Sequence, residues 1–175
     1  PLGPIFRGGG AFFLRRSFKG EVLYPKIFAA YIQKILDEGF HIEFFVEGGR
    51  SRTGKLLPPK IGFLSLVIDA YIKNKSDDMF FVPIYIGYDR VLEEKSYIHE
   101  IEGGKKAPEN LKNVIKARKF LNKKYGKIYL NFHDPISLKQ HLAKIDKPVA
   151  ELTKNETKEI YTQFANKLVS AINRK

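Results

Sequence analysis

The sequence predicts an α/β domain in which a layered, largely parallel sheet is flanked by helices. Short apolar runs of strand type alternate along the chain with longer segments whose apolar residues recur at helical spacing. Such alternation is typical of βαβ units, which build parallel sheets and bind ligands at the carboxyl ends of the strands. At 175 residues the chain has the size of one domain with a substantial core.

The first half of the chain contains a helix with clear ends and several shorter apolar runs. The helix is predicted over 25–38, because proline suits a first helical turn, apolar residues recur at helical spacing and Gly39 is a good terminator. A second helix is predicted over 61–72 from its apolar stripe. Three apolar runs are predicted as strands or strand-like pieces: 2–6, 11–14 and 41–46.

The second half continues the alternation and ends in an amphipathic helix. Strands are predicted over 80–88 and 128–132, helices over 108–125 and 137–142, and a loop over the polar stretch 89–108. The last helix begins after Thr153, where Glu156 completes a capping box ahead of an apolar stripe. Residues 1–150 therefore form the body of the domain, and residues 151–175 form its terminal helix.

Composition limits the classes of partner and chemistry. The excess of 31 Lys and Arg over 19 Asp and Glu gives a net charge of +12, which favours acidic partners. The absence of cysteine excludes disulfides, thiolate catalysis and zinc–thiolate sites, and fits a reducing compartment. The apolar run 80–86 is too short to span a bilayer. No leader peptide is visible, and because the chain begins at Pro1 it is expected to be a piece of a longer protein or a processed product.

A glycine-rich basic loop follows the strand predicted over 41–46. Gly48 and Gly49 allow a sharp turn directly after the apolar run. Cationic and hydroxyl side chains follow at once: Arg50, Ser51, Arg52, Thr53 and Lys55. Such a loop at a strand end is expected to bind a small anion such as a phosphate. Glu47 would repel a phosphate, so it is expected either to brace an arginine or to accept a hydroxyl of the same ligand.

Two other interpretations of this loop stay open. The spacing Gly49-x-x-x-x-Gly54-Lys55 resembles a nucleotide-binding P-loop, but Leu56 stands where the magnesium-binding hydroxyl should be, and two prolines at 58 and 59 prevent the helix that should follow. The other interpretation is a solvated basic turn without a ligand.

Two further segments carry weaker signals. Arg15 and Arg16 point opposite ways if the chain is extended, so only one of them reaches a given pocket, and a guanidinium is a natural bidentate partner of a phosphate. A surface strand end with solvated charges explains them equally well. Pro83 interrupts an apolar strand, which places it at an edge, at a bulge or where backbone approaches a ligand.

Together these segments resemble the glycerol-3-phosphate acyltransferases, in particular the large membrane-associated bacterial enzymes that acylate position 1. The second of the family's four sequence blocks is matched by 3–7 and 9–16, the third by 45–60 and the fourth by 82–88, and similarity continues through 129–138. The chain is thus expected to be part of an acyltransferase domain.

No catalytic residue is expected in this chain. The family's His-x-x-x-x-Asp block precedes the second block, and the chain starts after it. His141 and Asp146 match the spacing but follow the fourth block, so we reject them as the catalytic pair. The chain alone is therefore expected to be inactive.

The resemblance implies substrates and roles. The reaction transfers a fatty acyl group from acyl-CoA or acyl carrier protein to glycerol 3-phosphate, with no cofactor and no metal. Arg16, Arg50 and Arg52 would hold the phosphate, and Glu47 would support them by accepting a glycerol hydroxyl or fixing an arginine. Other residues would complete the substrate site through backbone approach, loop polarity or the pocket wall: Gly48, Gly49, Ser51, Lys55 and Pro83.

The resemblance also implies a peripheral position on the cytoplasmic face of the bacterial inner membrane. Lysines on one side of the helix predicted over 108–125 would dock on anionic lipid or an acidic carrier protein, or would form an ordinary solvated face. The alternatives are a non-catalytic relative that binds glycerol 3-phosphate or anionic lipid and, less favoured, a basic nucleic-acid-binding module. Nucleic acid is not expected as a partner, because the aromatic residues mostly occupy core-periodic positions.

Overall fold

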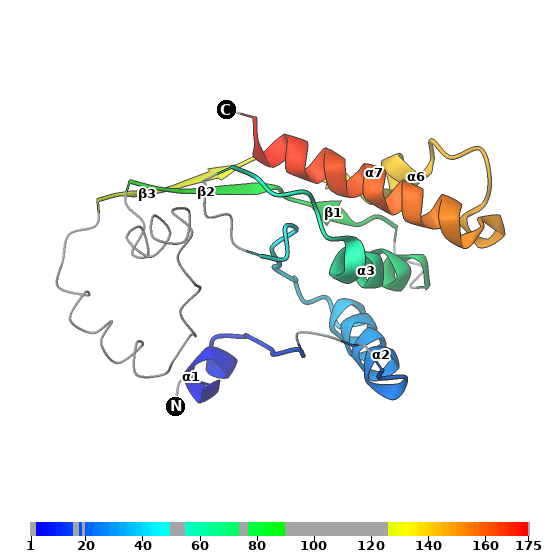
Figure 1. Cartoon of the computed structure of the whole chain (residues 1–175), viewed down its shortest axis with the longest axis horizontal. Coiled ribbons are helices and arrows are strands. Elements are labelled where there is room, and N and C mark those ends of the chain that lie inside the picture. The colour runs from blue at the N-terminus through cyan, green and yellow to red at the C-terminus, as the bar shows by residue number, and fades with distance from the viewer. Residues whose placement is uncertain are drawn as a thin grey trace, which may run out of the picture. The chain divides into compact units, whose positions relative to one another are not determined.

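The computed structural model describes residues 3–15, 18, 20–49, 55–73, 77–89 and 126–174 (Figure 1). They form a mixture of helices and short strands, which confirms the α/β class. The described elements are, in order, α1 (Gly3–Gly8), α2 (Leu23–Asp37), α3 (Ile61–Lys73), β1 (Phe80–Phe81), β2 (Ile84–Tyr88), β3 (Ile128–Phe132), β4 (Ile136–Ser137), α6 (Leu138–Leu142), the 3₁₀ turn η1 (Val149–Glu151) and α7 (Lys154–Ile172). The chain divides into two compact units, residues 1–42 with 66–75 and residues 43–65 with 76–175.

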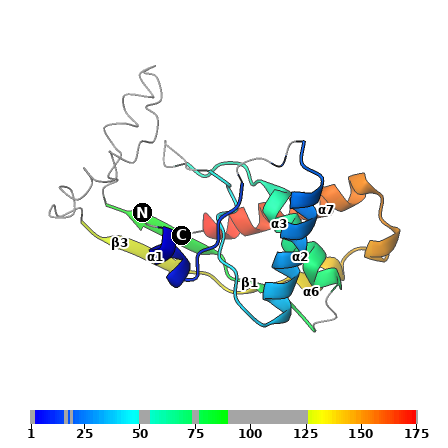
Figure 2. The ribbon, with the colours of Figure 1, turned by 90° about the horizontal axis from the view of Figure 1, so that it is seen from below.

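The first unit is organised around α2, which runs without a break from Leu23 to Asp37 (Figure 2). The helix predicted over 25–38 is confirmed. Phe28 and Ile32, one turn apart, are its buried residues. The helix ends as expected, because Gly39 takes the left-handed conformation with φ 79° and its N–H donates to the carbonyl of Leu36.

The segment before α2 differs from the prediction. Residues 2–6 were expected to be strand-like, but the described part belongs to α1, and 11–15 have no regular secondary structure. The physical reason is local hydrogen bonding: the N–H of Gly9 donates to the carbonyl of Ile5, and the N–H of Ala11 donates to the carbonyl of Phe6. The strand predicted over 41–46 is also wrong. An apolar run becomes a strand only by pairing, and residues 41–46 have no partner strand among the described residues.

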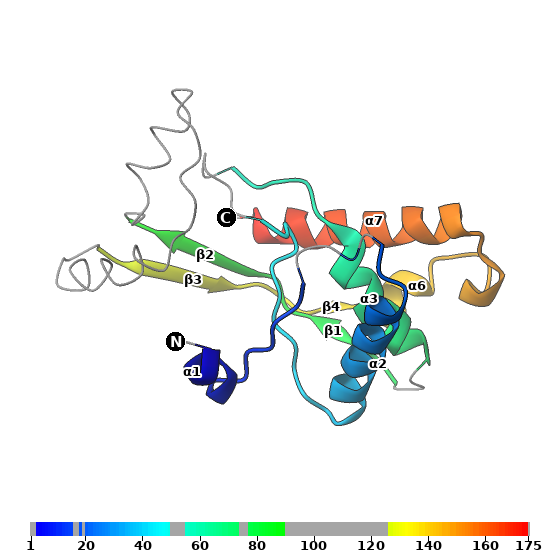
Figure 3. The same cartoon turned by 60° about the horizontal axis from the view of Figure 1, so that its bottom comes forward.

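The second unit contains two antiparallel strand pairs. β1 pairs with β4, with Phe80 opposite Ser137, and β2 pairs with β3, with Ile84 opposite Phe132 (Figure 3). A single strand was predicted over 80–88, but it is broken between β1 and β2, where Pro83 has no N–H to donate to a ladder. All pairings among the described strands are antiparallel, so the layered, largely parallel sheet stays a prediction.

Hydrogen bonds of Asp78 link β1 to β4 and to the start of α6. Its carboxylate accepts hydrogen bonds from the Ser137 hydroxyl at 2.6 Å and from the backbone N–H groups of Met79 at 2.7 Å and Lys139 at 3.0 Å. Partial burial opposes ionisation, but these bonds to the charged form outweigh it and lower the pKa of Asp78. Ser137 also caps α6 by accepting from the N–H of Gln140, which confirms the helix predicted over 137–142.

α7 packs on this arrangement through one stripe. Its Phe164 ring lies 5.1 Å from the ring of Phe81 and 4.8 Å from that of His141, so α7 lies along β1 and α6 (Figures 1 and 3). The capping box predicted at its start is confirmed, because Thr153 accepts from the N–H of Glu156 and Glu156 accepts from the N–H of Thr153. The α3 helix predicted over 61–72 is confirmed as well.

Two predictions fall wholly or almost wholly outside the described residues: the helix over 108–125 and the loop over 89–108. Among the residues that the structure describes, no helix combines the length and hydropathy that a membrane span requires.

Candidate functional site

Two hydrogen bonds join the ends of the glycine-rich loop, and a third closes a turn at its start. The backbone N–H of Lys60 donates to the carbonyl of Val46 at 2.9 Å, and the N–H of Gly48 donates to the carbonyl of Phe45 at 2.9 Å. The carboxylate of Glu47 accepts the backbone N–H of Leu57 at 2.6 Å. Since Val46 is buried, the loop leaves from and returns to an anchored base. Arg50, Ser51 and Arg52 lie outside the described residues.

Glu47 therefore has a partner that neither sequence interpretation named. We expected it to brace an arginine or to accept a ligand hydroxyl, whereas the structure uses one of its oxygens to close the loop. A carboxylate offers about four lone-pair positions on two oxygens, so the bond to Leu57 leaves capacity for a further donor.

The two glycines of the loop differ. Gly48 has φ 58°, a left-handed conformation that favours glycine, and a Cβ added to it would lie 2.9 Å from Cδ of Lys60, so the Lys60 side chain would have to move. A Cβ added to Gly49 would meet no atom within 4 Å. The role of Gly49 in allowing close approach of a ligand stays a prediction. Lys55 and Lys60 are exposed cations at the base of the loop.

The arginine pair is described at Arg15, while Arg16 lies outside the described residues. Arg15 Nη1 lies 2.6 Å from Oε1 of Glu21, and its guanidinium lies 4.8 Å from the centre of the Tyr24 ring. The backbone N–H of Arg15 donates to the Tyr24 hydroxyl at 3.1 Å. The sequence left open which arginine is available to a ligand, and the structure shows that the charge of Arg15 already has partners.

Pro83 is buried, and its carbonyl accepts the backbone N–H of His133 at 3.0 Å. Pro83 lies at a break between β1 and β2, a position that the sequence prediction did not include, and its role in a pocket wall stays a prediction. Sequence reasoning missed His133, whose Nε2 is buried without a hydrogen-bond partner among the described residues. No pattern in the sequence singled it out.

His141 is held within the packing of α6 on α7. Its ring lies against Phe164 and is hydrogen-bonded to the backbone of Ile160. Burial lowers the pKa of His141, and nearby Lys167 and Lys144 lower it further, against the opposing effect of the Ile160 bond. These contacts are those of a structural histidine. Within the described ranges, no group of three or more His, Asp or Glu side chains is placed to hold a metal ion.

Comparison with known proteins identifies the family. Residues 1–87 match the family described as acyltransferase, and residues 97–175 match the glycerol-3-phosphate acyltransferase C-terminal region. The glycerol-3-phosphate acyltransferase of Alteromonas mediterranea is 47% identical to the chain over 142 residues. The chain belongs to the glycerol-3-phosphate acyltransferase family. The enzymes of that name from Pseudoalteromonas translucida and Pseudomonas putida are 46% and 42% identical over 142 and 137 residues.

The matches to these glycerol-3-phosphate acyltransferases cover 78–81% of this chain but only 16–17% of the length of each relative. Arg16, the loop after Val46 and Pro83 all lie within the acyltransferase match, while β3, β4, α6 and α7 lie within the C-terminal match. The resemblance found in the sequence blocks is thereby confirmed. The division of the domain at residue 150 and the individual site residues stay predictions.

Proposed function

We propose that the full-length glycerol-3-phosphate acyltransferase to which these residues belong transfers a fatty acyl group from acyl-CoA or acyl carrier protein to position 1 of glycerol 3-phosphate. This chain contributes the part that holds the phosphate. The observation that carries the proposal is the loop after Val46, which is closed at its base by Glu47 and carries its cations between the two anchored ends. Membership of the family supports the reaction class.

The chemistry assigned to the loop follows from the charge of the substrate. A phosphate monoester is close to a dianion, so two or more cations are needed, and guanidinium groups bind it in a bidentate way. We assign this role to Arg16, Arg50 and Arg52, with Lys55 and Ser51 adding donors. The remaining capacity of Glu47 suits a glycerol hydroxyl. Pro83 would shape the wall beside it.

The bond-making step needs a general base, which by resemblance is the family's His-x-x-x-x-Asp block and lies outside this chain. The base takes the proton of the C1 hydroxyl, and the oxygen attacks the thioester carbonyl. The C–O ester bond forms as the C–S bond breaks, and the thiol leaves with a proton. The residues of this chain bind and orient the phosphate end so that the hydroxyl meets the thioester in a productive geometry.

The remaining assignments concern architecture and location. We infer that the short strands described here join a layered, largely parallel sheet in the full-length protein, for which the acyltransferase match is the support. We also propose that the protein lies at the cytoplasmic face of the bacterial inner membrane as a peripheral enzyme. The net charge of +12 supports attraction to an anionic lipid surface and to an acidic carrier protein.

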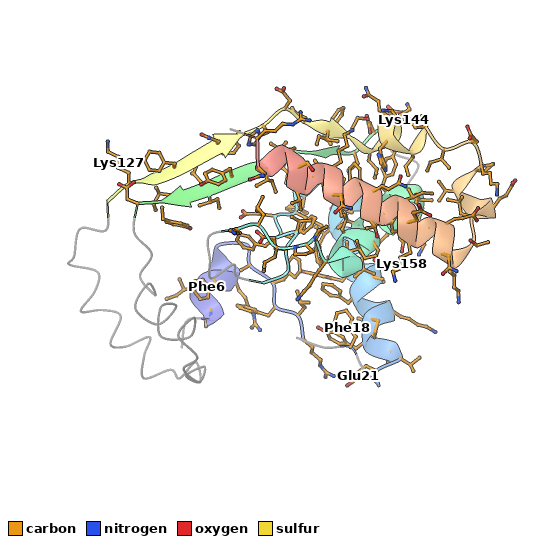
Figure 4. All side chains as sticks on the ribbon, turned by 45° about the horizontal axis from the view of Figure 1, so that its top comes forward. Phe6, Phe18, Glu21, Lys127, Lys144 and Lys158 are labelled. Carbon is orange, nitrogen blue, oxygen red and sulfur yellow. The ribbon has the colours of Figure 1, made fainter. Side chains whose placement is uncertain are left out.

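The test is a kinetic comparison in the full-length enzyme that carries these residues. Arg50→Ala and Arg52→Ala should each raise the apparent Michaelis constant for glycerol 3-phosphate about 10- to 100-fold, as expected for losing one charged hydrogen-bond partner. Lys158→Ala removes an exposed cation from α7 (Figure 4) and is the matched control, which should leave the constant unchanged. Unchanged kinetics in both single variants and the double variant would remove the loop from the phosphate site.

A further inference from the structure

The segment that carries the arginine pair is fixed to the first turns of α2 on both sides of Arg16. Upstream of it, the ring of Phe12 lies 6.1 Å from that of Phe28 and 5.6 Å from that of Tyr31. Downstream of it, the ring of Phe18 lies 5.3 Å from that of Tyr24. Figure 4 labels Phe18 and Glu21 at this end of α2. These aromatic contacts hold Phe12 and Phe18 against α2.

Arg15 adds the contacts closest to Arg16. Its N–H donates to the Tyr24 hydroxyl, its guanidinium lies over the Tyr24 ring, and its charge is paired with Glu21. The side chains of Arg15 and Glu21 are 58% and 46% exposed, and surface pairs of this kind contribute little to stability. The contacts therefore serve to orient Arg15, since its backbone N–H and its guanidinium both contact Tyr24.

We propose that Arg15, Glu21 and Tyr24, which we name the Arg15 clasp, form a positioning group for glycerol 3-phosphate binding at Arg16. The inference rests on the proposed function, in which Arg16 is a phosphate ligand. Arg15 does not touch the phosphate. The clasp neutralises the charge of Arg15 and restrains the backbone of Arg15, one residue before Arg16. Less conformational freedom is therefore lost when the substrate binds.

The clasp makes a specific kinetic prediction in the full-length enzyme. Tyr24→Phe removes only the hydroxyl that accepts the Arg15 N–H, and Glu21→Gln removes only the charge that pairs with Arg15. Each should raise the apparent Michaelis constant for glycerol 3-phosphate about 2- to 10-fold, the worth of one hydrogen bond, with kcat and the Michaelis constant for acyl-CoA unchanged. Because the residues act as one unit, the effects of Arg15→Ala and Tyr24→Phe should not add in the double variant.

Two variants of α2 serve as matched controls. Tyr31→Phe makes the same chemical change on the same helix, at a residue whose ring contacts Phe12. Glu38→Gln breaks a comparable surface pair, Lys34 Nζ to Glu38 Oε1 at 3.0 Å. Both should keep the parent kinetics, and all variants should keep the parent melting temperature.

Arg16→Ala distinguishes the proposed role of Arg16 as a phosphate ligand from the proposed role of the clasp. If it leaves binding of glycerol 3-phosphate unchanged, the proposed role of Arg16 fails. If it weakens binding strongly while Tyr24→Phe and Glu21→Gln behave like Tyr31→Phe and Glu38→Gln, the role of Arg16 stands and the clasp is overturned. The clasp is also overturned if Arg15→Ala weakens binding as much as Arg16→Ala and Tyr24→Phe has no effect, because Arg15 would then be a phosphate ligand itself.

Discussion

Glu47 has a structural role in the loop that the sequence did not predict. A carboxylate repels a phosphate held nearby unless it is itself hydrogen-bonded or paired, and the N–H of Leu57 donates such a hydrogen bond to Glu47 at 2.6 Å. The same bond joins the two ends of the loop. The side chain therefore has a structural role that its charge alone does not reveal.

Substitution at Glu47 separates these roles. In the full-length enzyme, Glu47→Gln keeps an oxygen that accepts the Leu57 N–H, so the melting temperature should change little. The amide cannot balance an arginine, and kcat should fall about 10- to 100-fold, as for loss of a charged hydrogen bond. Glu47→Asp should be nearly as poor, because a shorter side chain withdraws the carboxylate from both partners. Wild-type kinetics in Glu47→Gln would reduce Glu47 to a brace of the loop.

At the scale of elements, α2, α3, α6 and α7 could be predicted from the sequence, whereas α1 was predicted as a strand-like piece and only the strand over 128–132 matches its prediction throughout. α2 and α7 have signals within a few residues of their ends, Gly39 and the pair Thr153 and Glu156, which act through local hydrogen bonds. A strand depends on a partner elsewhere in the chain. For this reason the run 41–46 looked like a strand without forming one, and the break at Pro83 divided a run that looked continuous.

The capping box of α7 predicts a pH dependence of stability. Hydrogen bonds from the Thr153 backbone and hydroxyl and the ion pair with Lys147 lower the pKa of Glu156 from its usual 4.5 to about 2. Because the folded state prefers the charged form, this stabilisation is fully present above about pH 5 and is lost as the pH falls toward 2. Urea unfolding of the protein between pH 2 and 7 measures it.

Two variants test the origin of that dependence. Glu156→Gln should flatten the acid limb of the stability profile, because the amide does not titrate, and Thr153→Ala should flatten it only in part, because it removes the hydroxyl bond but keeps the backbone N–H bond and the Lys147 ion pair. Thr162→Ala is the matched control, since the hydroxyl of Thr162 bonds to the Lys158 carbonyl within the same helix at 2.7 Å. An acid limb that is as steep in Glu156→Gln as in the parent would place the pH dependence at another group.

At the scale of the whole molecule, the candidate site could be predicted only where its chemistry is contiguous. The loop residues from Glu47 to Lys55 follow one another, so their charges and glycines were visible in the sequence. The closure by Leu57 and the clasp through Tyr24 were not predicted, because those contacts depend on the path of the backbone. Family membership then connects a chain that covers 17% of its relatives' length to the chemistry of a much larger enzyme.

Substrate binding by the whole protein can be measured without turnover. A ligand that binds only the folded state raises stability by about 2.7 kcal/mol when present at 100 times its dissociation constant. Glycerol 3-phosphate should therefore raise the melting temperature of the full-length protein. Glycerol should not, because it lacks the anion, and inorganic phosphate should act more weakly, because it lacks the hydroxyls.

The double variant Arg50→Ala/Arg52→Ala should lose most of the shift, and Lys158→Ala should keep it. A shift that survives in the double variant would place the phosphate elsewhere. A normal shift without acyl transfer would identify a binding relative rather than an enzyme, since the phosphate grip and the general base are separate parts of the proposal.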